Sequence, residues 1–127
     1  METAAYKKDI IKYARKFIDF FEKDFGSDES KFLFFDGDDF PDACDALGFE
    51  MDCGAAFNAV DRESWSSVDV LKENIDKFTD IKVIGSGLYS SWRYYNHWGT
   101  PLEAGEHTKE WFLVLLRRLI FLCEQDS

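Results

Sequence analysis

The sequence predicts an all-α protein, or a mainly α protein with at most a short strand pair, folded as a compact single domain of four to five packed helices over residues 1–127. Three observations support this prediction. Apolar residues recur at three- and four-residue intervals, which is the period of an amphipathic helix. Hydrophobic residues make up 46% of the chain and include thirteen Phe, which suffices for a buried core. The chain has no internal repeat, and no linker divides it.

The first predicted helix begins near Thr3, a capping residue, and ends near Gly26, which suits a helix stop. Its buried face is expected to run for about six turns. The apolar residues of that face are Tyr6, Ile10, Tyr13, Ala14, Phe17, Phe20, Phe21 and Phe25. Residues 32–35, four consecutive apolar side chains, fit either a short strand or a buried helical turn.

Shorter helices are expected in the middle of the chain. The second predicted helix has Pro41 in its first turn and Gly48, which suits a left-handed backbone, at its end. The segment AAFNAV at 55–60 is compatible with a turn or two of helix. Ser66 and Asp69 have the spacing of a capping box and predict the start of a third helix. The apolar face of this third helix consists of Val68, Leu71, Ile75 and Phe78.

A fourth helix is predicted to begin after Asp80 and to end near Gly99. Its apolar residues step by three or four along one face, and they are Ile81, Ile84, Leu88, Trp92 and Tyr95. Inside a helix, Gly85 and Gly87 each cost up to about 1 kcal/mol relative to Ala. A strand through residues 82–87 is therefore the main alternative.

The last predicted helix runs from Lys109 to about Glu124, with Thr108 as its cap. Residues 111–116 within it are apolar on nearly all sides. A helix of this kind must bury more than one face. We therefore expect it to lie centrally, packed on more than one side.

The cysteines favour a cytoplasmic protein with reduced thiols. Cys44, Cys53 and Cys123 are odd in number and unrelated in spacing, and a domain with an adequate core needs no cross-link. Basic residues interrupt the N-terminal segment, which therefore does not resemble a signal peptide. The longest apolar stretch, at 111–116, is far shorter than the roughly 20 residues of a membrane span. We expect no membrane association.

Acidic residues are concentrated in one region of the chain. No Lys or Arg lies between Lys31 and Arg62, and this region supplies most of the net charge of −10. The residues expected to form an acidic, partner-binding surface are Asp36, Asp38, Asp39, Asp42, Asp45 and Glu50. Such a surface repels nucleic acids and anionic membranes and attracts a basic protein. The same pattern also fits a solvated surface that keeps the protein soluble.

The segment SSWRYYNHW at 90–98 contributes to a second candidate site. On a helix its Trp and Tyr residues at 92, 94, 95 and 98 share one half with the apolar residues, so packing explains them. The other half carries Tyr89, Arg93, Asn96 and His97, whose spacing lets the side chains converge on one ligand group. The competing structural interpretation is that Arg93 pairs with a carboxylate of the acidic region while Asn96 and His97 close the helix end.

The sequence shows no catalytic signature, pre-arranged metal-ligand pair or cofactor motif. Asp36, Asp38 and Asp39 begin like a calcium loop, but Leu47 stands where such a loop needs Glu. The GSG at 85–87 lacks the third glycine and the flanking elements of a dinucleotide-binding fingerprint. We therefore expect no catalytic residue, no metal ion and no cofactor.

The segments LGFEMDCG at 47–54 and SSWRYYNHW at 90–98 resemble recurring segments of a family of small uncharacterised bacterial proteins. The resemblance covers most of the chain from residue 32 to residue 123. It implies a bacterial or mobile-element origin and an association of Asp52 with Trp92, Arg93, Asn96 and His97. An Asp52–Arg93 ion pair is its specific hypothesis. It implies no activity, cofactor or catalytic residue.

These observations lead to two predictions of function. The first is a non-catalytic, acidic intracellular protein that binds a basic surface of a protein partner, of the inhibitor, immunity or anti-defence type or as a nucleic-acid mimic, with no direct nucleic-acid binding. The alternative is a small-molecule-binding or hydrolytic domain with a pocket around Arg93 and His97, to which Asp52, Tyr89 and Asn96 would contribute.

Overall fold

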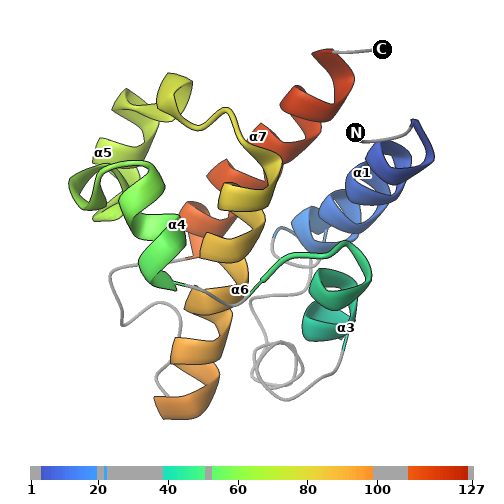
Figure 1. Ribbon diagram of the computed structural model, residues 1–127, viewed down its shortest axis with the longest axis horizontal. Helices are drawn as coiled ribbons and strands as arrows, with labels where there is room; N and C mark the ends of the chain where they lie inside the picture. The colour runs from blue at the N-terminus through green and yellow to red at the C-terminus, as the bar shows by residue number, and fades with distance from the viewer. Residues whose placement is uncertain (1–3, 20–21, 23–38, 51–52, 99–108, 126–127) are drawn as a thin grey trace.

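All regular structure in the described residues is helical, as the sequence predicts. The structure is a computed structural model that describes residues 4–19, 22, 39–50, 53–98 and 109–125 (Figure 1). Within these ranges lie six α-helices, slightly above the four to five expected. Their bounds are α1 Ala4–Asp19, α3 Asp39–Ala46, α4 Cys53–Ala59, α5 Val68–Glu73, α6 Ile81–Trp98 and α7 Lys109–Gln125. Two short 3-10 helices, η2 Arg62–Trp65 and η3 Ile75–Lys77, join the middle elements.

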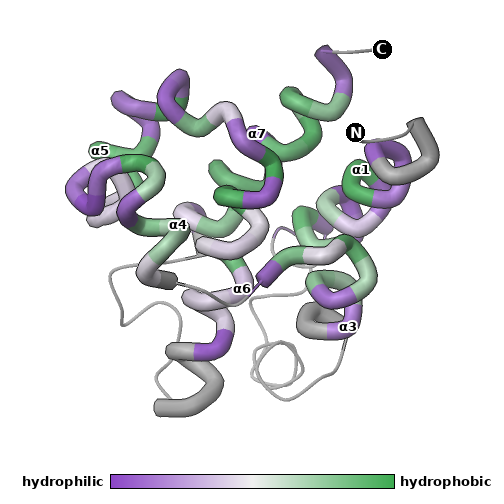
Figure 2. The backbone as a smooth tube through the Cα atoms, viewed as in Figure 1, coloured by the Kyte–Doolittle hydropathy of each residue, from purple (hydrophilic) through white to green (hydrophobic). Residues whose placement is uncertain are grey.

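The long helix α7 lies centrally, which confirms the expectation from its apolar composition. It packs against α1, α5 and α6, and Figure 2 shows apolar residues along most of its length. Its buried residues are Trp111, Phe112, Leu113, Leu115, Leu116, Leu119 and Cys123. A helix with neighbours on several sides needs apolar side chains on several sides. None of the described helices is long and apolar enough to cross a lipid bilayer.

The helix α6 forms through both of its glycines, so the alternative of a strand at 82–87 is wrong. Gly85 lies against Phe49, because a Cβ atom at this position would be 2.3 Å from Cγ of that ring. Gly87 lies against Trp65 in the same way, with a Cβ position 2.3 Å from Cζ3. Glycine therefore allows two aromatic rings to touch the helix backbone. Burial of those rings offsets the low helix propensity of the two glycines.

The ends of the middle helices are only partly as predicted. Gly48 has a φ of 75° and ends α3 in the left-handed region, as expected. Ser67, not Ser66, is the cap of α5, because its side chain accepts a hydrogen bond from the backbone N–H of Val70 at 3.3 Å. Ser66 instead ends η2, where its N–H donates to the carbonyl of Glu63 at 3.0 Å. The predicted capping box is therefore wrong by one residue.

The third predicted helix is divided into α5 and η3. Asn74 follows α5, and its side-chain amide donates to the carbonyl of Val70 at 2.9 Å. Ile75 begins η3, and Phe78 follows η3 with no exposed surface. The predicted apolar face of the third helix is nevertheless confirmed, since all four residues of that face lie in the core or pack against it.

Some predicted features fall outside the described residues. The first predicted helix is confirmed as α1 up to Asp19, whereas its predicted continuation to Gly26 is described only at residue 22. Residues 32–35 and Thr108 also lie outside the described residues. The weakly patterned segment at 55–60 is helical, since most of it belongs to α4.

Candidate functional site

Three residues of the predicted acidic surface have described side chains, namely Asp42, Asp45 and Glu50, and all three are exposed. We use the name acidic surface for these three carboxylates from here on. Asp36 and Asp38 lie outside the described residues, and Asp39 begins α3 without a described side chain.

The acidic surface faces solvent because α3 and the following segment are amphipathic. Ala43, Cys44 and Leu47 are buried toward the core, so the helical period turns Asp42 and Asp45 outward. The apolar face of α3 therefore fixes the position of its carboxylates.

No Lys or Arg of the described residues forms an ion pair with the acidic surface. The ion pairs found in the described part of the chain join other elements. They are Arg15–Glu124 at 3.7 Å, Lys72–Glu110 at 2.8 Å, Lys77–Asp61 at 3.4 Å and Arg117–Glu22. The bases of these four pairs are thus directed to carboxylates outside the acidic surface.

Tyr89 connects the second candidate site to the acidic surface. Its hydroxyl donates a hydrogen bond to Oδ1 of Asp45 at 3.0 Å, and only 7% of the residue is exposed. Burial, together with the hydrogen bond and negative charge of Asp45, raises the pKa of Tyr89 to about 12, although nearby Arg93 acts in the opposite direction. Tyr89 thus holds α6 against α3. The spacing argument could not detect this bond, because it joins residues far apart in the sequence.

The Tyr89→Phe substitution should remove one tyrosine that ionises near pH 12, and should lower the free energy of unfolding at neutral pH by about 1 kcal/mol. The unfolded chain loses this proton near pH 10. The stability that Tyr89 contributes is therefore complete below pH 10 and is lost as the pH rises toward 12. The measurement is the difference in tyrosinate absorbance between wild type and variant as the pH rises.

A difference curve centred near pH 10 would contradict this expectation, since 10.0 is the ordinary value for tyrosine. Asp45→Asn serves as the second variant. It removes the negative charge that opposes ionisation while keeping a hydrogen-bond acceptor at the same place. The difference curve for Tyr89 should then move to lower pH.

The remaining members of the second candidate site are described only in part. Arg93 is exposed on α6, whereas the side chains of Asn96 and His97, and all of Asp52, lie outside the described residues. The proposed Asp52–Arg93 ion pair lies outside them as well. A ligand pocket around Arg93 and His97 therefore stays a prediction. Within the described residues, no group of three or more His, Cys, Asp and Glu side chains is placed to hold a metal ion.

Cys44 lies behind the acidic surface and is buried as a free thiol. Burial, and to a smaller extent the charge of Asp45, raises the pKa of the Cys44 thiol well above its usual range. Since the thiolate is the reactive form, Cys44 is unsuited to nucleophilic chemistry. In the core, the Cys44 side chain packs as a small apolar residue.

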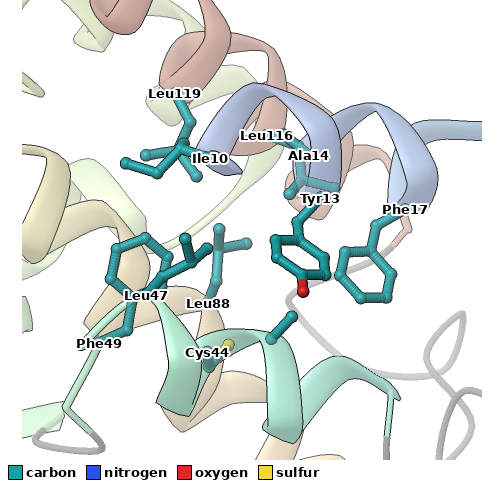
Figure 3. A pocket seen from close by; sticks show the side chains of 11 residues that line it. Ile10, Tyr13, Ala14, Phe17, Cys44, Leu47, Phe49, Leu88, Leu116 and Leu119 are labelled. Atoms are coloured by element: carbon teal, nitrogen blue, oxygen red, sulfur yellow. The ribbon is translucent and has the colours of Figure 1, made fainter. Parts of the chain in front are cut away.

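Next to Cys44 the core contains a small apolar cavity of about 20 Å³ (Figure 3). Tyr13 and Phe17 of α1 point toward α3 across this cavity, and Leu88 of α6 closes another side. Small-molecule sites usually have volumes of about 300 to 1,000 Å³. The cavity is therefore a packing gap between α1, α3, α6 and α7.

A larger, open groove of about 510 Å³ lies between α4 and α6 and is called the α4–α6 groove below. It is lined by Gly48, Glu50, Ala55, Ala56, Ala59, Lys82, Val83 and Ser86. Two hydrogen bonds join lining residues of the groove: the Ser86 hydroxyl donates to the carbonyl of Glu50, and Lys82 Nζ donates to the carbonyl of Gly48 at 3.4 Å. Sequence reasoning missed this groove, because alanines carry no chemical signal.

Comparisons with protein-family models, with curated proteins and with solved structures found no match to this chain. The resemblance to a bacterial family through residues 47–54 and 90–98 therefore stays a prediction.

Proposed function

We propose that the protein is a non-catalytic binding protein whose acidic surface occupies a basic surface of a protein partner. One observation carries this proposal: Asp42 and Glu50 are exposed and have no ion pair with any Lys or Arg in the described ranges. Because no such base neutralises them, these exposed carboxylates produce a negative potential in the surrounding solvent, and this potential attracts cations. Asp45 adds a third charge, held in place by the hydroxyl of Tyr89.

The surrounding charge distribution supports the same proposal. The chain carries 25 acidic and 15 basic side chains, and no base lies between Lys31 and Arg62. Complementary charge of this kind accelerates association and excludes partners of the wrong sign. The proposal covers inhibitors, immunity or anti-defence proteins and nucleic-acid mimics, all of which present carboxylates to a basic site. A cytoplasmic location is part of it, in keeping with the free thiols of Cys44 and Cys123.

The test is capture of a partner by the immobilised protein, followed by its identification and a binding titration. We expect the Asp42→Asn/Glu50→Gln variant to bind that partner about tenfold more weakly, since two contacts worth about 0.7 kcal/mol each would be lost. Wild-type binding should also weaken steeply between about 50 and about 500 mM salt. Both substitutions keep side-chain size, so the fold should be unaffected.

The matched control is Glu73→Gln/Asp76→Asn, which changes the net charge equally at exposed residues of α5 and η3. This control should bind like wild type. Equal weakening by both double variants would mean that net charge alone, and not the acidic surface, determines binding. Binding that does not change with salt would show that the interaction is not electrostatic. Either result overturns the proposal.

A further inference from the structure

We infer that the α4–α6 groove is the anchoring pocket for one arginine side chain of the basic partner, with the guanidinium at Glu50 and the aliphatic stem against the alanines of α4. This inference rests on the proposed function and extends it to a defined part of the surface. The groove and the acidic surface share Glu50, so a partner attracted by the carboxylates meets the groove at the same place.

The walls of the groove suit the stem of an arginine. Ala55, Ala56 and Ala59 form one wall, and Val83 of α6 contributes to the other. Arginine buries its three methylene groups against apolar surface while its charged guanidinium stays in water or next to polar groups. Short side chains leave room for such a stem, and the volume of about 510 Å³ exceeds what one side chain needs. Arginine is also enriched among the residues that dominate binding at protein interfaces.

The backbone of Glu50 is fixed at the groove, and its carboxylate is available to receive the charged end. Its backbone carbonyl accepts a hydrogen bond from the Ser86 hydroxyl, which ties the segment after α3 to α6. Its carboxylate is exposed and has no Lys or Arg partner among the described side chains. A planar guanidinium binds a carboxylate through two parallel hydrogen bonds, which an ammonium cannot do. We therefore expect arginine rather than lysine.

Lys82 also lines the groove, and its charge opposes a cationic occupant. Its ammonium group, however, is 3.4 Å from the Gly48 carbonyl oxygen, so an acceptor already faces this charge. Among the lining residues Glu50 supplies one negative charge and Lys82 one positive charge, so the lining itself is close to neutral. The exposed carboxylates of Asp42 and Asp45 and the net charge of −10 make the surrounding potential negative, which favours a cation over an anion in the groove.

The experiment is an NMR titration of the full chain with the capped tripeptide acetyl-Gly-Arg-Gly-amide, up to about 20 mM because a single side chain binds weakly. We expect shifts of the backbone amides of Ala55, Ala56, Val83 and Ser86. The citrulline tripeptide, which has the same shape without the charge, should cause much smaller shifts. The lysine tripeptide should bind at least severalfold more weakly than the arginine tripeptide.

Three variants test the geometry. Ala55→Leu fills the groove from an exposed position and keeps helix propensity, so it should abolish the shifts. Asn58→Leu places the same side chain on α4 at a residue that does not line the groove, and should leave them unchanged. Glu50→Gln should weaken binding at least fivefold, whereas Lys82→Met should strengthen it, because it removes the opposing charge.

The outcomes separate this inference from the proposed function. Shifts that surround Asp42 and Asp45 but spare the groove would overturn the inference and leave the acidic surface as the binding site. A complete lack of shifts, or stronger binding of acetyl-Gly-Glu-Gly-amide that Lys82→Met abolishes, would also overturn it. The proposed function is tested independently by the partner-binding experiment with Asp42→Asn/Glu50→Gln and its control.

Discussion

The Gly87→Ala variant should lose about 2 to 3 kcal/mol of unfolding free energy through the addition of a single methyl group. The new Cβ atom would lie 2.3 Å from Cζ3 and 2.7 Å from Cη2 of Trp65, closer than any real carbon contact. The indole cannot move aside easily. Its Nε1 donates to the carbonyl of Val60 at 3.0 Å, and its ring packs edge-on against Phe57 and Phe78.

The test depends on whether Gly87→Ala lowers or raises the free energy of unfolding. At an exposed helix position, replacing Gly with Ala would raise stability by about 1 kcal/mol through backbone entropy alone. Urea denaturation followed by far-ultraviolet circular dichroism detects either a gain or a loss of stability as a shift of the denaturation midpoint. A midpoint above that of wild type would show that Trp65 does not contact the backbone of α6. Gly85→Ala, which meets the ring of Phe49 at 2.3 Å, should shift the midpoint in the same direction as Gly87→Ala.

These glycines also show what the sequence could and could not predict about the fold. The recurrence of apolar residues from Ile81 to Tyr95 was sufficient to predict a helix there, because burial of one face dominates helix stability in a protein. Helix propensity, in contrast, treats Gly85 and Gly87 as destabilising, and for this reason a strand through residues 82–87 remained the alternative. Their benefit is a contact with rings from other elements, and no local pattern contains that information.

Helix ends were predicted to within a residue or two where one residue type has a clear physical role. Gly48 was assigned correctly because only a glycine adopts a φ of 75° without strain. Ser66 and Ser67 are adjacent and equally able to cap, so the choice between them depended on η2, which the sequence did not reveal. The unpredicted η2 has its own cap, since Asp61 accepts hydrogen bonds from the backbone N–H and hydroxyl of Ser64.

The candidate site was predicted in its charges but not in its shape. The sequence showed the concentration of carboxylates, whereas the outward position of Asp42 and Asp45 follows from the burial of Ala43 and Leu47 in the structure. The bond from Tyr89 to Asp45 and the α4–α6 groove both join segments separated by long stretches of chain. Contacts of this kind arise from packing, so a single sequence contains no periodic signal for them.

The substitution with the largest expected effect is Trp111→Ala, which should lower the free energy of unfolding by about 4 kcal/mol. Trp111 has no exposed surface and lies where α7 meets η2. Its ring contacts those of Trp65 and Phe112 at centroid distances of 6.1 and 5.1 Å. Removing the indole leaves a cavity that the surrounding helices cannot close. This loss is a large share of the roughly 5 to 15 kcal/mol that stabilises a typical domain.

Two further variants separate the contributions of volume and hydrogen bonding at this position. Trp111→Phe keeps most of the ring but removes the buried bond from Nε1 to the Trp65 carbonyl, 2.9 Å long, so about 2 kcal/mol should be lost. Phe121→Ala truncates an aromatic residue of the same helix that is 47% exposed, and it should cost less than about 1 kcal/mol. Urea denaturation of the three proteins gives this order directly. A Phe121→Ala loss equal to that of Trp111→Ala would mean that α7 does not bury its tryptophan face in the core.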